Sequence, residues 1–225
     1  MAEWLSANEA LIRLMLSGLW ETLQMTLLAA LFSYLLGLPL GVMLVVTDKG
    51  GIRENAALNQ VLGAVVNVLR SVPFLILILM LFPVARVVMG TTIGTRAAIF
   101  PLVVSAFPYV ARMVESSLRE VDSGVIEAAQ SMGATTFQII WKVLLPEATP
   151  SLINGLAISV TTILAYTAMA GAVGAGGLGK IAIDYGMYRF DMPKLYTASL
   201  LLVVLVQIIQ VLGTRASSLI DKRRR

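Results

Sequence analysis

Residues 148–179 read ATPSLINGLAISVTTILAYTAMAGAVGAGGLG and contain no Asp, Glu, Lys or Arg. This run is longer than the ~20 residues that an α-helix needs to cross ~30 Å of hydrocarbon. Residues 22–47 and 195–214 form two further uncharged runs, which are shorter but still long enough to cross. These three stretches predict membrane-spanning helices, and they decide the fold class.

The composition of the whole chain agrees with a lipid solvent. Of its 225 residues, 58% are hydrophobic and 13% are charged, whereas soluble domains have roughly 45–50% and 25%. The chain has no cysteine and no histidine. This excludes a disulfide scaffold, a thiol nucleophile, a Cys/His zinc site and a histidine acid–base relay. We therefore expect no catalytic residue and no metal site.

Two weaker stretches complete the predicted set of spans. Residues 58–84 are apolar apart from Arg70, and residues 93–116 carry Arg96 and Arg112 near their ends, where long side chains can reach the membrane interfaces. The sequence thus predicts an all-α integral membrane protein with five transmembrane helices, four being the competing number. The single transmembrane domain covers residues 1–225, with approximate spans 16–46, 58–84, 93–116, 148–173 and 195–217.

Basic residues near the span ends predict the orientation. Ten lie on one side of the predicted spans and six on the other, with Arg70 inside a span. The richer side is expected in the cytoplasm. Glu3 and Glu9 at the start and the basic residues 222–225 at the end favour opposite sides, as an odd number of spans requires. We expect the N-terminus outside and the C-terminus in the cytoplasm.

The longest cytoplasmic segment is expected at residues 119–147, and its pattern predicts two short amphipathic helices. The first ends at Gly133, which follows apolar residues at helical spacing. Thr135 and Gln138 have the spacing of a capping box that starts the second, which runs until Pro146. The apolar positions are Val125, Ala128, Ala129 and Met132 in the first and Phe137, Ile140, Trp141 and Leu144 in the second. Such helices either lie against headgroups or the base of the bundle, or dock a soluble partner.

The loop resembles the EAA loop of ATP-binding-cassette (ABC) importer permeases. Glu127-Ala128-Ala129 is followed by Gly133, six positions after the glutamate, and then by Leu145-Pro146. The loop also lies between the third and the fourth of the five predicted spans, that is, between the antepenultimate and the penultimate span. Other stretches resemble the methionine-uptake (D/L-methionine) branch of that family: residues 70–74 (RSVPF), 108–115 (PYVARMVE) and 165–179 (AYTAMAGAVGAGGLG). The resemblance covers roughly residues 15–220.

The resemblance implies a permease subunit that forms a functional homodimer in the bacterial inner membrane. Its implied partners are two cytoplasmic ATP-binding-cassette ATPase subunits, which bind ATP and Mg, and an extracytoplasmic methionine-binding protein. The chain itself is then no enzyme and binds no cofactor and no nucleic acid. The implied ATPase-coupling residues are Glu127, Ala128, Ala129, Gly133, Phe137, Trp141, Leu145 and Pro146. The alternatives are a permease for another amino acid or small nutrient, and a self-contained secondary transporter.

Residues 174–180 contain two misleading nucleotide-binding motifs. A G-x-G-x-x-G pattern is present, but no strand is expected before it, and Ile181 stands where a phosphate-binding loop needs Ser or Thr. We instead expect either close helix packing or a hinge at the outer mouth. The residues concerned are Gly171, Gly174, Gly176, Gly177 and Gly179. Gly37 and Gly41 in the first span likewise favour close helix packing.

Polar residues within the spans mark a candidate translocation path and gate. A cation such as Arg70 costs ~2.5–3.5 kcal/mol inside a membrane helix on insertion scales, so it must face protein or water. It either bonds free carbonyls or guides a carboxylate. Thr162 and Tyr166 supply hydroxyls in the fourth span, and Met169 either packs or closes an apolar constriction. An uncharged path suits a neutral or zwitterionic cargo.

Overall fold

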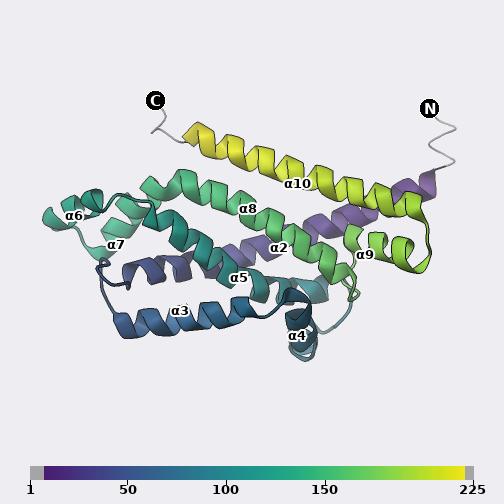
Figure 1. Cartoon of the computed structure of the whole chain (residues 1–225), viewed down its shortest axis with the longest axis horizontal. Coiled ribbons are helices and arrows are strands. Elements are labelled where there is room, and N and C mark those ends of the chain that lie inside the picture. Colours follow the sequence, from purple (N-terminus) through teal and green to yellow (C-terminus); the bar gives the residue numbers. More distant parts are fainter. Residues whose placement is uncertain (1–7, 221–225) are drawn as a thin grey trace. The chain divides into compact units, whose positions relative to one another are not determined.

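The computed structural model describes residues 8–220, and this part of the chain contains helices, turns and loops but no strand. Glu3 and the basic tail at 222–225 lie outside the described residues. Figure 1 shows the order of the helices along the chain. They are α2 (Glu9–Val46), α3 (Ala56–Ser71), α4 (Phe74–Met89), α5 (Thr95–Arg119), α6 (Ser123–Ser131), α7 (Thr136–Ile139), the π-helix η1 (Ile140–Leu144), α8 (Leu145–Gly171), α9 (Gly177–Ile183), the π-helix η2 (Asp184–Tyr188) and α10 (Met192–Ile220).

Four helical stretches are long and apolar enough to cross a membrane. They are Glu9–Val46, Thr95–Arg119, Thr136–Gly171 and Met192–Ile220. The helices α3 and α4 pass the same test only when taken together as one bent pair. The described residues therefore contain four spans, or five if that pair is counted.

The structure differs from the single helix expected over residues 58–84. The helix breaks at Val72 and Pro73, so that α3 ends at Ser71 and α4 begins at Phe74. Val72 has φ −83° and ψ 123°, which is an extended conformation. Proline disfavours helical geometry in the residue before it and supplies no N–H to continue the helix. The predicted apolar run is therefore present, but it forms two helices.

Contacts divide the chain into two compact units, each built from three stretches. Unit 1 contains residues 1–30, 73–104 and 160–209, and unit 2 contains residues 31–72, 105–159 and 210–225. In unit 1, one buried cluster joins the first turns of α2 to α9 and α10 through Met15, Leu178, Ile181 and Ala198. In unit 2, a buried cluster joins α5 to the start of α8 and packs against α2; it comprises Val110, Val114, Leu118, Val121, Leu144 and Ala148.

Two glycines bring the backbones of α2 and α5 into contact within unit 2. A Cβ atom at Gly37 would lie 2.8 Å from the carbonyl oxygen of Phe107, and one at Gly41 would lie 2.6 Å from that of Ala111. Both distances are too short for a carbon atom. The close helix packing expected at Gly37 and Gly41 is confirmed.

We predict that Gly41→Ala destabilises the protein by about 1–3 kcal/mol, the usual cost of overpacking. Gly155→Ala in α8 is the matched control, because its Cβ would lie 3.5 Å from the flexible Met113 side chain and alanine is the better helix former. Thermal unfolding of the two purified variants in detergent measures the difference. Equal stability of both variants would contradict the close approach of α2 and α5.

Candidate functional site

The first helix of the EAA-like loop is capped at both ends. The Asp122 side chain accepts a hydrogen bond from the Gly124 N–H at 2.7 Å and so caps the start of α6. At the other end, the N–H of Gly133 donates to the Gln130 carbonyl at 2.9 Å, and that of Ala134 donates to the Ala129 carbonyl at 3.1 Å. This pair of bonds is the Schellman motif. It ends α6 and turns the chain toward α7.

Gly133 occupies the position of that motif which requires a left-handed backbone. Its φ is +79°, a conformation that residues with a Cβ adopt only at a cost. A Cβ at Gly133 would meet no other atom of the described chain within 4 Å. The first helix therefore ends at Gly133 in a left-handed turn, whereas no close approach within the described chain requires the glycine.

The second helix starts as predicted but does not end at Pro146. The capping box is confirmed: the Thr135 N–H donates to Gln138 Oε1 at 2.8 Å, and the Gln138 N–H donates to Thr135 Oγ1 at 3.3 Å. From there α7, η1 and α8 form one uninterrupted helical stretch, Thr136–Gly171. The Leu145 N–H bonds the Ile140 carbonyl in a wide π-turn, and Pro146 follows it directly. The widened turn therefore lies where the ring and the missing N–H of a proline would disturb a regular α-turn.

The loop presents aromatic and methionine side chains to its surroundings. Phe137 is 69% exposed, Trp141 59% and Met132 81%. The rings of Phe137 and Trp141 are tilted against each other, with centroids 6.0 Å apart. The expected stripe is split, because Leu144 is buried in the core of unit 2 while Phe137 and Trp141 face outward. Large exposed apolar groups of this kind mark interaction sites.

The eight predicted coupling residues do not all face outward. Ala129 is buried, and Leu145 is half-buried. The exposed ones are Glu127, Ala128, Gly133, Phe137, Trp141 and Pro146. Met132 is a further exposed residue that was missing from the predicted set. Its signal in the sequence is its place in the helical pattern directly before Gly133.

A groove of about 200 Å³ lies beside α6 in unit 2. One wall is the turn after α2, with Asp48 and Lys49, and another contains Arg119, the last residue of α5. Glu127 and Gln130 of α6 line the same groove. The glutamate of the EAA motif therefore lies in a charged setting that also contains basic side chains.

Three of the four candidate path residues lie in unit 1. The ring of Tyr166 stacks on that of Phe74, with centroids 4.7 Å apart and planes 5° from parallel. Met169 is exposed, and Thr162 is half-buried. Phe74 was not predicted as a path residue, although it ends the RSVPF stretch that carries part of the family resemblance. The stacking identifies it as the side chain that holds Tyr166 in place.

Arg70 belongs to unit 2 and lies in the last turn of α3. Its side chain is exposed, and it forms no hydrogen bond or ion pair with residues 8–220. The pairing with free backbone carbonyls that the sequence suggested is therefore absent from this part of the chain. Arg70 lies one residue before the end of α3 and three residues before Pro73, instead of in the middle of a continuous span.

The glycine-rich segment packs α8 against α9 within unit 1. A Cβ at Gly171 would lie 2.3 Å from the Lys180 nitrogen, and one at Gly179 would lie 2.4 Å from the Ala168 Cα atom. The two helix ends are thus in backbone contact inside one chain. The remaining glycines of the set have positive φ angles: Gly174, Gly176 and Gly177.

Two side chains of α2 hold the start of α9. The Gly177 N–H donates to Glu21 Oε2 at 2.7 Å, and the Leu178 N–H donates to Thr22 Oγ1 at 2.9 Å. The Thr22 hydroxyl in turn donates to the Gly18 carbonyl at 2.8 Å. Sequence reasoning missed both residues. Polar side chains at the start of an uncharged run were visible, but their partners are 156 positions away in the sequence.

The all-helical membrane fold and the EAA-like loop define an ABC-type permease. The chain belongs to the family described as "Binding-protein-dependent transport system inner membrane component", whose model matches residues 34–225. It is accordingly a transport component of the inner membrane, the permease subunit of an ABC importer.

Individual relatives resemble the chain over most of its length. The "Probable D-methionine transport system permease protein MetI" of Vibrio cholerae serotype O1 is 50% identical over 223 residues, which cover 99% of this chain and 98% of that protein. The "Methionine import system permease protein MetP" of Bacillus subtilis is 45% identical, over 80% and 82% of the two chains. A solved structure described as an inward-facing conformation of the MetNI methionine ABC transporter has a TM-score of 0.94 and 47% identity, over 95% and 99%.

We predict that Thr22→Val weakens the start of α9 by about 1–2 kcal/mol, because the buried Leu178 N–H loses its acceptor. Thr26→Val is the matched control: Thr26 is equally buried on α2, but its hydroxyl has no partner among the described residues. Removing that hydroxyl should be neutral or stabilising. Hydrogen exchange at the Leu178 amide checks both, and equal exchange in the two variants would refute the capping by Thr22.

Proposed function

We propose that this chain forms the translocation path for methionine in an ABC importer of the bacterial inner membrane. ATP hydrolysis in partner subunits drives the transport. Support comes from the relatives named above, which are similar over most of their length and carry methionine transport in their names. The sequence stretches at 70–74, 108–115 and 165–179 support the same branch of the family.

The proposed assembly is a homodimer of this chain with two cytoplasmic ATPase subunits and an extracytoplasmic methionine-binding protein. One EAA-like loop per chain means that two copies are needed to engage two ATPase subunits, which favours twofold symmetry. ATP and Mg²⁺ bind to the ATPase subunits in this proposal, and this chain binds no cofactor. The N-terminus lies outside and the C-terminus in the cytoplasm, because the proposed orientation places α6 and α7 where ATP is available.

The observation that carries the proposal is the exposed apolar face of the coupling loop. Met132, Phe137 and Trp141 stay accessible while the helices that hold them are capped and packed. A short helix with an exposed apolar face suits a groove in a soluble partner. Glu127 adds a charge for a basic partner group, and buried Ala129 supports α6 from beneath. Leu145 and Pro146 join α7 and η1 to the membrane part.

Thr162, Tyr166, Met169 and Arg70 are proposed to line or gate the path. The first three offer hydroxyl and thioether groups without charge, which suits a zwitterionic amino acid, and Arg70 offers an unpaired cation for a carboxylate. The contact between Gly171 and the start of α9 favours a packing role for the outer glycine segment over a freely moving hinge. The remaining glycines, Gly174, Gly176, Gly177 and Gly179, are proposed to act in the same segment.

We predict that Gly133→Arg leaves insertion intact but abolishes ATP-driven methionine uptake, because the new side chain projects from the docking face. Gly90→Arg is the matched control. Gly90 also has a positive φ (+75°), and a Cβ added there would meet no atom within 4 Å, but Gly90 ends α4 and lies outside the coupling loop. The measurements are co-purification of the ATPase subunit and uptake of labelled methionine into energised vesicles.

Three outcomes would contradict parts of this proposal. Normal uptake by Gly133→Arg would refute docking through the loop. Uptake of methionine by vesicles that lack the ATPase subunit would identify a secondary transporter instead. Competition by another unlabelled amino acid, stronger than that by methionine itself, would show that the cargo is a different nutrient.

A further inference from the structure

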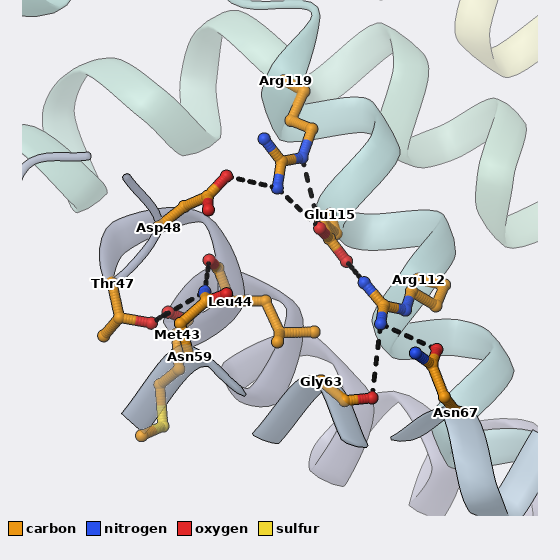
Figure 2. Close-up of polar contacts among 10 residues, drawn as sticks. All are labelled: Met43, Leu44, Thr47, Asp48, Asn59, Gly63, Asn67, Arg112, Glu115 and Arg119. Atoms are coloured by element: carbon orange, nitrogen blue, oxygen red, sulfur yellow. Dashed lines mark hydrogen bonds and ion pairs between the residues drawn. The ribbon is translucent and has the colours of Figure 1, made fainter. Parts of the chain in front are cut away.

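A buried carboxylate joins two arginines near the end of α5 in unit 2 (Figure 2). Arg112 Nη1 donates to Glu115 Oε2 at 2.6 Å, while Arg119 donates to Glu115 Oε1 from Nη2 at 2.8 Å and from Nε at 3.2 Å. The Glu115 side chain is 9% exposed. Both carboxylate oxygens are thus occupied by charged donors, in a setting with little water to compete.

The two arginines extend this network to other segments of unit 2. Arg119 Nη2 lies 2.6 Å from Asp48 Oδ2, in the turn that follows α2. Arg112 Nη2 donates to Asn67 Oδ1 at 2.8 Å and to the Gly63 carbonyl at 3.4 Å, both on α3. The hydrogen bond from Arg119 lowers the pKa of Asp48, so this carboxylate is ionised at neutral pH. Glu115 therefore stands at the centre of links from α5 to the turn after α2 and to the middle of α3.

The corner between α2 and α3 is itself fixed by polar contacts. Asn59 Nδ2 donates to the Leu44 carbonyl at 2.7 Å and to Thr47 Oγ1 at 3.1 Å. The Thr47 hydroxyl donates to the Met43 carbonyl at 2.6 Å. Figure 2 shows these contacts beside the ion pairs. The start of α3 is thereby held on the last turn of α2, and the corner offers a firm anchor for Arg119.

The network also reaches the coupling loop. Arg119 is the last residue of α5, and Asp122 caps α6 three positions later. Asp48 and Arg119 line the same groove as Glu127. The ion pair between Arg119 and Asp48 therefore lies between α6 and the α2–α3 corner.

We propose that Glu115 is a positioning residue for energy coupling. By bridging Arg112 and Arg119, it holds the start of the coupling loop on the α2–α3 corner, so that a displacement of α6 moves α2, α3 and α5 together. This inference rests on the proposed docking of the loop to an ATPase subunit. It adds a residue outside the EAA motif that transmits the movement without touching ATP or methionine.

The test compares ATP hydrolysis and methionine uptake in the same proteoliposomes, which contain the complete complex. Glu115→Gln keeps the shape of the side chain but removes the charge that both arginines share. We expect the complex to assemble and hydrolyse ATP, while the methionine imported per ATP falls about tenfold, within the usual range of coupling between sites. Glu120→Gln is the matched control: it makes the same charge change in an exposed side chain that has no hydrogen bond or ion pair within residues 8–220.

Two further variants keep the proposal testable if Glu115→Gln does not fold. Asp48→Asn removes the negative charge that pairs with Arg119 at the corner, and such partly exposed pairs contribute little to stability. It should also lower the import per ATP, whereas Glu115→Asp, which keeps the charge, should restore part of the loss. An unchanged ratio in Asp48→Asn, or in an assembled Glu115→Gln complex, would overturn the proposal.

The outcome separates this inference from the docking proposal. If Gly133→Arg loses the ATPase subunit while Glu115→Gln keeps a normal import per ATP, docking stands and the role of Glu115 is refuted. If Gly133→Arg retains both the subunit and uptake, docking through the loop is refuted. The role of Glu115, which depends on that docking, is then refuted as well.

Discussion

A bilayer offers no water that could hydrogen-bond the polypeptide backbone, and the other features of this chain follow from that constraint. Within hydrocarbon, a helix is the only open structure that satisfies its own N–H and C=O groups. Where a helix must end, other groups replace the missing bonds. Glu21 and Thr22 accept the first N–H groups of α9, and the Schellman turn at Gly133 closes α6. The irregular parts of the fold therefore lie where such partners exist.

Most of the helices could be predicted, because an uncharged run or a capping pattern is a local property. The Thr135–Gln138 capping box was readable from spacing alone. The break at Val72 and Pro73 was harder to predict, since the apolar run continues through it. At Pro146 the error was the opposite, because the sequence predicted a helix end where the helix continues. A proline usually ends a helix, but the π-turn before Pro146 let the helix continue. The caps from Glu21 and Thr22 depend on tertiary structure, which no local pattern contains.

The candidate site likewise combines features that the local sequence predicts with features that depend on tertiary structure. The sequence identified the coupling loop through its motif but could not separate outward from inward positions, so that Ala129 was grouped with exposed residues and Met132 was missed. The network around Glu115 was invisible as a unit, because its members come from two helices, α3 and α5, and the turn after α2. Helical spacing assigns residues to a face, whereas burial depends on what packs against that face.

The π-helix at Ile140–Leu144 has a geometric consequence for the whole stretch from α7 to α8. A π-turn holds one residue more than an α-turn, and one residue corresponds to about 100° of rotation around a helix axis. The angular phase of Phe137 and Trp141 is therefore shifted relative to α8. One continuous helical stretch can thus point its docking side chains in one direction and its packing side chains in another. The two directions are set independently of each other.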